Sequence, residues 1–371
     1  MDEKKREQIV EIAKAFCYEG TLMGVRAFGN GHINDTYLLT YEIGKMGIMN
    51  VILQKMNKVV FPKPEEVMEN IVGVTGFLKK KIEASGGNPY RETLTVIPTR
   101  DGMPYFKDSD GEYWRSFVYI TDTSCYDLPE NDEVFYQCAY AFGNFQSMLA
   151  DYPAETLHET IKNFHNTKER FATFKKAVEE DVMGRADAVR EEIEFVLERE
   201  ADAKYFTELL EAGELPLRVT HNDTKLNNIM VDNATGKGIC VIDLDTVMPG
   251  LAMNDFGDSI RSGASTGAED EKDLSKINCD MNLFEVFAKG FIEGCGGKLT
   301  AGEIKLLPMG AKIMTYECGM RFLTDYLQGD VYFKIHRPEH NLDRCRTQFK
   351  LVADMEEKWQ IMQEIVSRYG I

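Results

Sequence analysis

One polar stretch decides the fold class: Thr220-His221-Asn222-Asp223-Thr224-Lys225-Leu226-Asn227-Asn228-Ile229. It lies in a loop between apolar segments, and the apolar pair Val241-Ile242 leads into a further aspartate, Asp243, twenty residues beyond Asp223. A lone His-x-Asp sequence is common and usually structural. Here an asparagine follows the aspartate by five residues, and a second aspartate ends a predicted strand. This full combination is much rarer and indicates a chemical site.

Each of these side chains has a role that phosphoryl transfer requires. The reaction needs a carboxylate that orients and deprotonates the acceptor hydroxyl, and oxygen ligands that hold Mg²⁺ on the nucleotide phosphates. We therefore predict Asp223 as the base, with Asn228 and Asp243 as metal ligands. Mg²⁺ takes few protein oxygens and completes its shell with phosphate and water, which suits this pair. Asp245 either joins the metal ligands or caps the following turn.

Composition and charge limit the class of protein. The chain has 371 residues, 43% hydrophobic and 28% charged, which is typical of a globular protein long enough for two domains. The net charge of −18 repels phosphate backbones and anionic lipids, so we expect no nucleic-acid partner and no membrane partner. There is no run of about 18 apolar residues, and no signal peptide is expected. The eight scattered cysteines favour reduced thiols and a cytoplasmic location. Oligomeric state leaves no signal in the sequence.

The pattern of apolar residues predicts two lobes of different character. Strands are predicted at 25–28, 36–41, 50–56, 93–98 and 113–120, and a helix over 64–83. From about 131 the pattern is helical, including 178–199 and an amphipathic stretch over 343–369, with short strands only at 217–220, 229–232 and 239–243. We predict an α+β fold with a β-rich, nucleotide-binding lobe over 1–118 and a larger helical lobe over 119–371 that carries the catalytic groups.

The β-rich lobe offers candidates for the nucleotide side of the site. Gly29 and Gly31 lie between the first two predicted strands, where glycine lets backbone N–H groups approach phosphates, although such a turn is more often only a turn. The third strand carries Gln54-Lys55, where a kinase places a cation for the phosphates. Strand alternation puts the two side chains on opposite faces, and the sequence leaves open which one faces the cleft. The ion-pair partner of that cation is equally open among Glu65, Glu66 and Glu69.

The sequence Asp255-Phe256-Gly257-Asp258 imitates the metal-binding motif of protein kinases. It lies 32 residues beyond Asp223, and Asp243 already provides a metal ligand at a tighter spacing. We therefore interpret Asp255 and Asp258 as structural, with Arg261 or the loop at Asp223 as partners of their carboxylates.

These motifs resemble the aminoglycoside phosphotransferase and choline kinase-like group, which shares the two-lobed protein-kinase fold. Within that group the chain is most similar to the N-acetylhexosamine 1-kinases, over nearly its whole length. The similarity is carried by Gly31-His32-Ile33-Asn34, Leu53-Gln54, and the stretches 217–228, 242–246, 255–261, 317–323, 329–333 and 338–342. Most members of the wider group have a glycine after the histidine, where this chain has Asn222.

The resemblance implies ATP-dependent transfer of a phosphoryl group to the anomeric hydroxyl of N-acetylglucosamine or N-acetylgalactosamine, with Mg²⁺ as the metal. It implies that Asp223 accepts the proton of the C1 hydroxyl, and that His32, Arg321 and Tyr332 bind the sugar. From the residues alone, Arg321 would instead form a salt bridge with Glu317, four residues earlier on the same predicted helix.

Two alternatives stay open at this point. One is a kinase of the same fold for another small alcohol, such as an aminoglycoside or choline, whose positive charge an acidic chain would permit. The other is a non-catalytic nucleotide-binding protein of this fold. Such a protein would normally have lost Asp223, Asn228 or Asp243, and all three are present.

Overall fold

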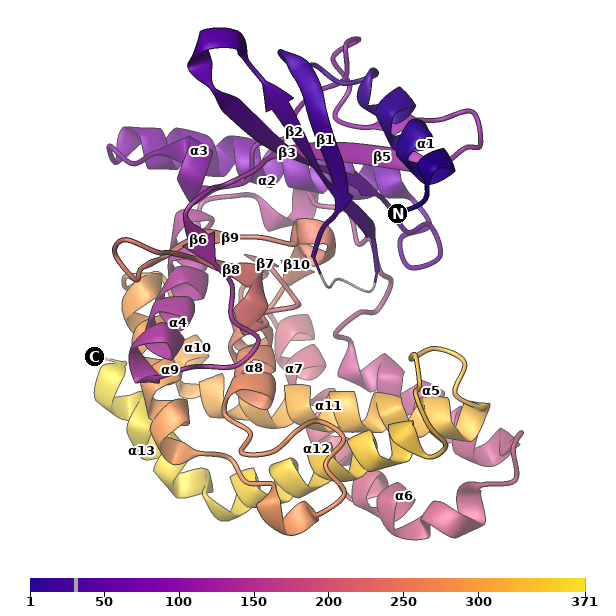
Figure 1. Cartoon of the computed structure of the whole chain (residues 1–371). Helices are drawn as coiled ribbons and strands as arrows, with labels where there is room; N and C mark the ends of the chain where they lie inside the picture. Colours follow the sequence, from indigo (N-terminus) through magenta and orange to yellow (C-terminus); the bar gives the residue numbers. More distant parts are fainter. Residues whose placement is uncertain (30–32, 371) are drawn as a thin grey trace.

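The computed structural model describes residues 1–29 and 33–370, and Figure 1 shows a small sheet lobe above a larger helical lobe. The strands are β1 (Thr21–Ala27), β2 (Asp35–Glu42), β3 (Ile48–Lys55), β4 (Phe106–Lys107), β5 (Tyr113–Val118), β6 (Thr123–Ser124), β7 (Arg218–Thr220), β8 (Ile229–Asp232), β9 (Gly238–Val241) and β10 (Met248–Gly250). The α-helices are α1 (Glu3–Ala13), α2 (Pro64–Ala84), α3 (Pro89–Glu92), α4 (Asp132–Met148), α5 (Thr167–Glu180), α6 (Arg190–Leu197), α7 (Glu200–Glu211), α8 (Ala252–Gly263), α9 (Met281–Cys295), α10 (Ala301–Lys305), α11 (Leu307–Gln328), α12 (His340–Glu357) and α13 (Trp359–Tyr369). This arrangement confirms the predicted α+β fold.

The small lobe is built on an antiparallel sheet with strand order β1-β2-β3-β5-β4. One face packs on α1, where Ile9 and Phe16 are buried with Leu53 and Trp114. The residues of α2 share a separate core cluster with Phe117 of β5. Alternation along β3 and β5 therefore gives the sheet one face toward α1 and one toward the rest of the molecule.

The strand predicted at 93–98 is not formed as a regular strand. The segment does run beside β5, because the Ile97 N–H donates to the Ser116 carbonyl at 2.8 Å and the Val118 N–H donates to the Thr95 carbonyl at 2.9 Å. Only an isolated bridge between Val96 and Phe117 results. Pro98 has no N–H with which to continue the ladder.

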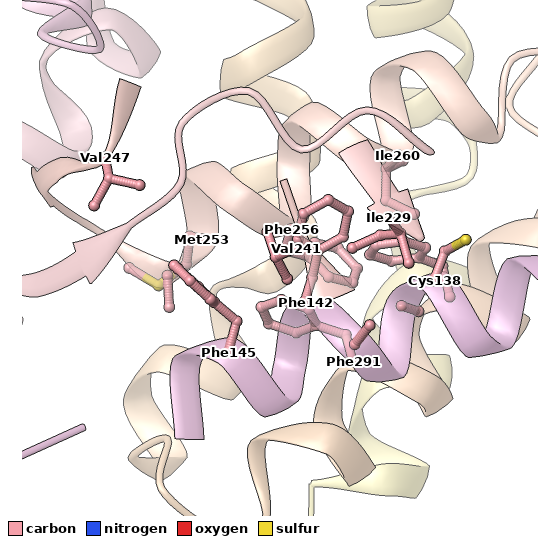
Figure 2. Packing of buried hydrophobic residues seen from close by; sticks show 14 of the residues in the cluster. Cys138, Phe142, Phe145, Ile229, Val241, Val247, Met253, Phe256, Ile260 and Phe291 are labelled. Atoms are coloured by element: carbon pink, nitrogen blue, oxygen red, sulfur yellow. The ribbon is translucent and has the colours of Figure 1, made fainter. Parts of the chain in front are cut away.

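The helical lobe is held together by close helix contacts around α4, α8, α9 and α11. Figure 2 shows Phe142 and Phe145 of α4 among Phe256 of α8 and Phe291 of α9. Helices α8 and α11 touch at a glycine, since a Cβ at Gly257 would lie 2.2 Å from the Gly310 carbonyl oxygen. This close approach fixes the position of α8 against α11.

Two long helical predictions are broken in the structure. Helix α5 ends before Asp181, whose φ of 34° is left-handed, and a 3₁₀ turn over Ala186–Val189 precedes α6. The stretch predicted over 343–369 forms α12 and α13, which are separated at Lys358. All eight cysteines are free thiols. Within residues 1–29 and 33–370, no helix combines the length and apolar character that a membrane crossing requires.

Candidate active site

The loop after β7 has a backbone bend at Asn222. Its φ is 65°, a left-handed value that asparagine tolerates better than most residues with a side chain. The side chain then fixes the bend: Nδ2 donates to the Thr246 carbonyl at 2.9 Å, and Oδ1 accepts from the Thr220 hydroxyl at 2.9 Å. Asn222 therefore meets a conformational demand that a glycine would meet without these bonds.

Two carboxylates of α8 hold the same loop from behind. Asp255 accepts the backbone N–H groups of His221 at 2.9 Å and Asn222 at 2.8 Å. Asp258 accepts the Thr224 N–H at 2.9 Å and pairs with Arg261 at 2.9 Å. These contacts confirm that Asp255 and Asp258 are structural, with both of the predicted partners.

His221 connects this loop to the strand that ends at Asp243. Its ring is buried edge-on against Phe142 and Phe145. Nε2 lies 2.8 Å from the Ile242 carbonyl, and Nδ1 accepts the Asp223 N–H at 3.3 Å. Since a carbonyl only accepts and an N–H only donates, the ring is the neutral form protonated on Nε2.

Strand pairing brings Asn228 and Asp243 together. Ile229 pairs with Val241, and the Ile242 N–H donates to the Asn228 carbonyl at 2.9 Å, so Asp243 follows directly. The Asn228 Nδ2 donates to the Asp223 carbonyl at 2.8 Å, while its Oδ1 accepts no hydrogen bond from the described residues. Burial, with Asp245 and Asp223 nearby, raises the pKa of Asp243 to about 6, although Arg115 opposes the shift. A free amide oxygen beside crowded carboxylates is a donor set that suits a hard divalent cation.

Lys225 lies beside the predicted base. Its Nζ is 2.7 Å from Asp223 Oδ1, and the lysine side chain is half-exposed. Burial opposes its positive charge, but the carboxylates of Asp223 and Asp258 outweigh it and raise the pKa of Lys225. Sequence reasoning missed this residue, although it lies only two positions from Asp223.

On the predicted nucleotide side, the structure decides which of Gln54 and Lys55 faces the cleft. Gln54 faces away from α1, whereas Lys55 lies on the α1 face and pairs with Glu112 at 3.2 Å. Alternation along β3 thus removes Lys55 from the cleft. Gly29 has a φ of 77° with open space where a Cβ would stand. Gly31 and His32 lie outside the described residues.

The structure supplies a cation that sequence reasoning missed. Arg115 of β5 lies directly opposite Gln54, and its Nε donates to Gln54 Oε1 at 3.0 Å. Its Nη1 forms an ion pair with Asp245, and both side chains are buried, at 2% and 5% exposure. The other Asp245 oxygen accepts from Asn34 Nδ2 at 2.7 Å. The sequence signal for this residue was an arginine within the strand Tyr113–Val118, whose other residues are apolar, aromatic or hydroxyl-bearing.

On the other side of the loop, α11 contributes Glu317 and Arg321. Glu317 is bound by His165 Nδ1 at 2.8 Å and the Thr167 hydroxyl at 2.6 Å, so the predicted Glu317–Arg321 salt bridge is wrong. His165 Nε2 reaches the Asn222 carbonyl at 3.1 Å. Both ring nitrogens thus face acceptors, as an imidazolium requires. Burial alone would lower the pKa of His165, but the neighbouring Glu317 carboxylate has the larger effect and raises that pKa. Burial alone would likewise raise the pKa of Glu317, but the neighbouring His165 has the larger effect and lowers that pKa.

Arg321 is enclosed by aromatic rings. Its Cζ lies 5.5 Å from the ring centre of Phe164, 5.7 Å from Tyr332 and 5.4 Å from Phe333. Within the described part of the chain it has no ion-pair partner. The structure therefore brings the two predicted sugar-site residues, Arg321 and Tyr332, together.

A buried carboxylate shapes the loop that carries Tyr332. Asp325 accepts the backbone N–H groups of Val331 at 2.9 Å, Tyr332 at 2.8 Å and Phe333 at 3.0 Å. Asn341 Nδ2 also donates to Asp325, at 2.9 Å. Residues 331–333 belong to no helix or strand, so these hydrogen bonds fix the path of the backbone beside Arg321.

Comparisons with known proteins place this geometry in context. A model of the phosphotransferase enzyme family matches residues 24–274, more than half of the chain. A choline kinase from Cryptosporidium parvum Iowa II is similar in structure, with a TM-score of 0.60 and 14% identity over 97% of this chain and 97% of that chain. A microcompartment-associated aminopropanol kinase has a TM-score of 0.56 and 15% identity over 98% and 99%. An amicoumacin kinase in complex with AMP-PNP and Ca²⁺ has a TM-score of 0.56 and 12% identity over 96% and 96%. At such identities the likeness concerns the fold.

Proposed function

The chain belongs to the phosphotransferase enzyme family, and we propose that it uses ATP and Mg²⁺ to phosphorylate the anomeric hydroxyl of an N-acetylhexosamine. The acceptor would be N-acetylglucosamine or N-acetylgalactosamine, and the product the sugar 1-phosphate. The nucleotide would lie on the side of the small lobe, and the sugar between the Asp223 loop and α11.

The metal assignment rests on Asn228 and Asp243. Among the described residues no group of three or more His, Cys, Asp or Glu side chains could hold a metal, so the ion would depend on further oxygens. Nucleotide phosphates and water supply these in Mg²⁺ sites of kinases. When bound there, Mg²⁺ would neutralise charge on the phosphates.

The chain's own residues then divide the remaining work. Asp223 orients the acceptor hydroxyl and takes its proton late in the transfer. An anomeric hydroxyl is more acidic than an ordinary alcohol, so a carboxylate is a sufficient base. Lys225, beside Asp223, places a positive charge where the phosphoryl group must approach. Most of the rate would come from positioning and charge neutralisation.

One observation supports the choice of acceptor: Arg321, which this proposal places beside the acceptor, has aromatic neighbours and no ion-pair partner among the described residues. Choline and aminoglycosides are cations. At about 4 Å and an effective dielectric of about 20, a like charge costs about 4 kcal/mol, or roughly a thousandfold in affinity. A neutral acetamido sugar instead offers hydroxyl and carbonyl oxygens to the fork of Arg321, and a ring face to Tyr332.

The test is an ADP-release assay with ATP and Mg²⁺ across N-acetylglucosamine, N-acetylgalactosamine, glucose, galactose, choline and kanamycin. We expect turnover with the acetamido sugars and a product whose phosphate is lost in mild acid. Arg321→Gln should raise the KM for the sugar, and Lys176→Gln, on an exposed face of α5, serves as the charge-matched control. Turnover on choline or kanamycin alone would contradict the sugar assignment and leave the kinase assignment standing. No turnover on any acceptor by a protein that binds MgATP would favour the non-catalytic alternative.

A further inference from the structure

The small lobe carries a linked row of side chains on the face that turns away from α1. Thr36, Gln54 and Arg115 occupy directly opposed positions on three neighbouring strands. Gln54 Nε2 donates to the Thr36 hydroxyl at 3.0 Å, and Arg115 Nε donates to Gln54 Oε1 at 3.0 Å. Side chains at directly opposed positions share one face of a sheet. Arg115 therefore occupies the same face as Gln54, one strand farther along.

The helix carboxylates do not serve as partners for this arginine. Glu65 is bound by the Tyr113 hydroxyl, Glu66 pairs with Lys63 at 2.7 Å, and Glu69 lies 2.6 Å from His158. The carboxylate that meets Arg115 is Asp245, from the large lobe. Phosphotransfer in kinases needs a cation for the phosphates that is held by a carboxylate, and in protein kinases this is a strand lysine paired with a helix glutamate. In this chain the paired cation is instead Arg115 of β5, and its carboxylate partner is Asp245 in the turn after Asp243.

The position of Asp245 puts the ion pair beside the predicted metal ligands. Asp245 is two residues beyond Asp243, in the 3₁₀ turn Leu244–Thr246. Asn34, from the segment that joins β1 and β2, donates to it as well. Asn228 bonds to the Asp223 carbonyl and lies beside the strand end that carries Asp243, so the carboxylates of Asp223, Asp243 and Asp245 belong to one part of the site. The proposed function places the nucleotide phosphates there, and a positive charge would offset these carboxylates.

We propose that Arg115 is the cation that contacts the nucleotide phosphates, and that Asp245 is the carboxylate that holds it in the cleft. A guanidinium has five N–H donors in a planar fork, so it keeps Asp245 and Gln54 while further donors remain for a phosphate oxygen. The inference rests on the ATP dependence in the proposed function and is independent of the acceptor.

The test measures binding of MgATP and of adenosine by titration calorimetry, with no acceptor present. Arg115→Gln removes the charge but leaves Asp245 buried without its partner, which can prevent folding. The double variant Arg115→Gln/Asp245→Asn removes both charges and avoids that problem. Lys55→Gln is the matched control, because this cation lies one residue from Gln54 on the opposite face of the sheet.

We expect the folded double variant to bind MgATP roughly tenfold more weakly or worse, with adenosine binding unchanged, because only the phosphates meet Arg115. Lys55→Gln should bind both ligands as the unmodified protein does. Equal losses of MgATP and adenosine binding would overturn the inference, since they would indicate a structural role. Unchanged MgATP binding by the double variant would overturn it too. Because no sugar is present, a failed acceptor assignment leaves the measurement valid.

Discussion

Replacing Asp325 should disorder the loop that frames Arg321 without affecting the nucleotide side. Its carboxylate accepts three backbone N–H groups of residues 331–333. Hydrogen bonds to a charged group contribute about 1.5–3 kcal/mol each. The lower value applies here, because Tyr332 is 62% exposed and the freed N–H groups regain water. Three bonds then give roughly 4–5 kcal/mol for the ordered loop, or about a thousandfold in its population.

The assay combines steady-state kinetics with hydrogen exchange. For Asp325→Ala we expect the acceptor KM to rise at least roughly tenfold, an unchanged ATP KM, and faster exchange of the amides of residues 331–333. Asp325→Asn keeps one carbonyl oxygen, so its acceptor KM and amide exchange should lie between those of Asp325→Ala and the unmodified protein. Asp232→Ala is the control, because Asp232 also holds loop N–H groups, those of Ala234 and Thr235, in a different loop. Protected amides and an unchanged acceptor KM in a folded Asp325→Ala protein would show that Asp325 does not order this loop.

Three further predictions concern the rest of the site. Asp223→Asn should lower kcat by roughly 10²–10⁴-fold while MgATP affinity, measured by calorimetry, stays within about twofold; lost nucleotide binding in a folded variant would count against Asp223 as the base. Asp243→Asn should raise the Mg²⁺ concentration needed for half-maximal activity, which a Mg²⁺ titration measures, and an unchanged requirement would exclude Asp243 as a ligand. The His165–Glu317 pair should stabilise the fold most between about pH 4.5 and 6.5. Because the pKa of His165 is raised in the folded protein, this stabilisation is lost as pH rises through that pKa. Because the pKa of Glu317 is lowered, the stabilisation is also lost as pH falls through that pKa. Urea unfolding of the unmodified protein and Glu317→Gln across pH 4–9 should show their stability difference shrinking on both sides, and a constant difference would contradict the pair.

The elements that the sequence predicted best are those with a local signal. Strand alternation and turn residues located β2, β3 and β8, and helical spacing located α2. The Asp223–Asn228 spacing and its link to Asp243 also lie within about twenty residues, so a linear motif captured them. The break at Asp181 was missed because a charged, helix-favouring composition hides a single left-handed residue.

The features that the sequence did not predict depend on contacts between distant segments. Arg115 meets Asp245 only because β5 pairs with β3 and the two lobes approach each other, a separation of 130 residues along the chain. Glu317 bonds to His165, which is 152 residues away along the chain. Arg321 therefore forms no ion pair with Glu317, its neighbour on the same helix. Helical spacing favoured the Glu317–Arg321 pair, and tertiary contacts overrode it.

The activity proposed for this chain is phosphoryl transfer to the anomeric oxygen of an acetamido sugar. The most direct measurement is the ³¹P–¹H correlation NMR spectrum of the product formed from N-acetylglucosamine or N-acetylgalactosamine with ATP and Mg²⁺. We predict a phosphorus signal coupled to the anomeric proton, absent when Asp223→Asn replaces the unmodified protein. A phosphate coupled to protons at another carbon, or no sugar phosphate from a protein that phosphorylates choline, would contradict this activity.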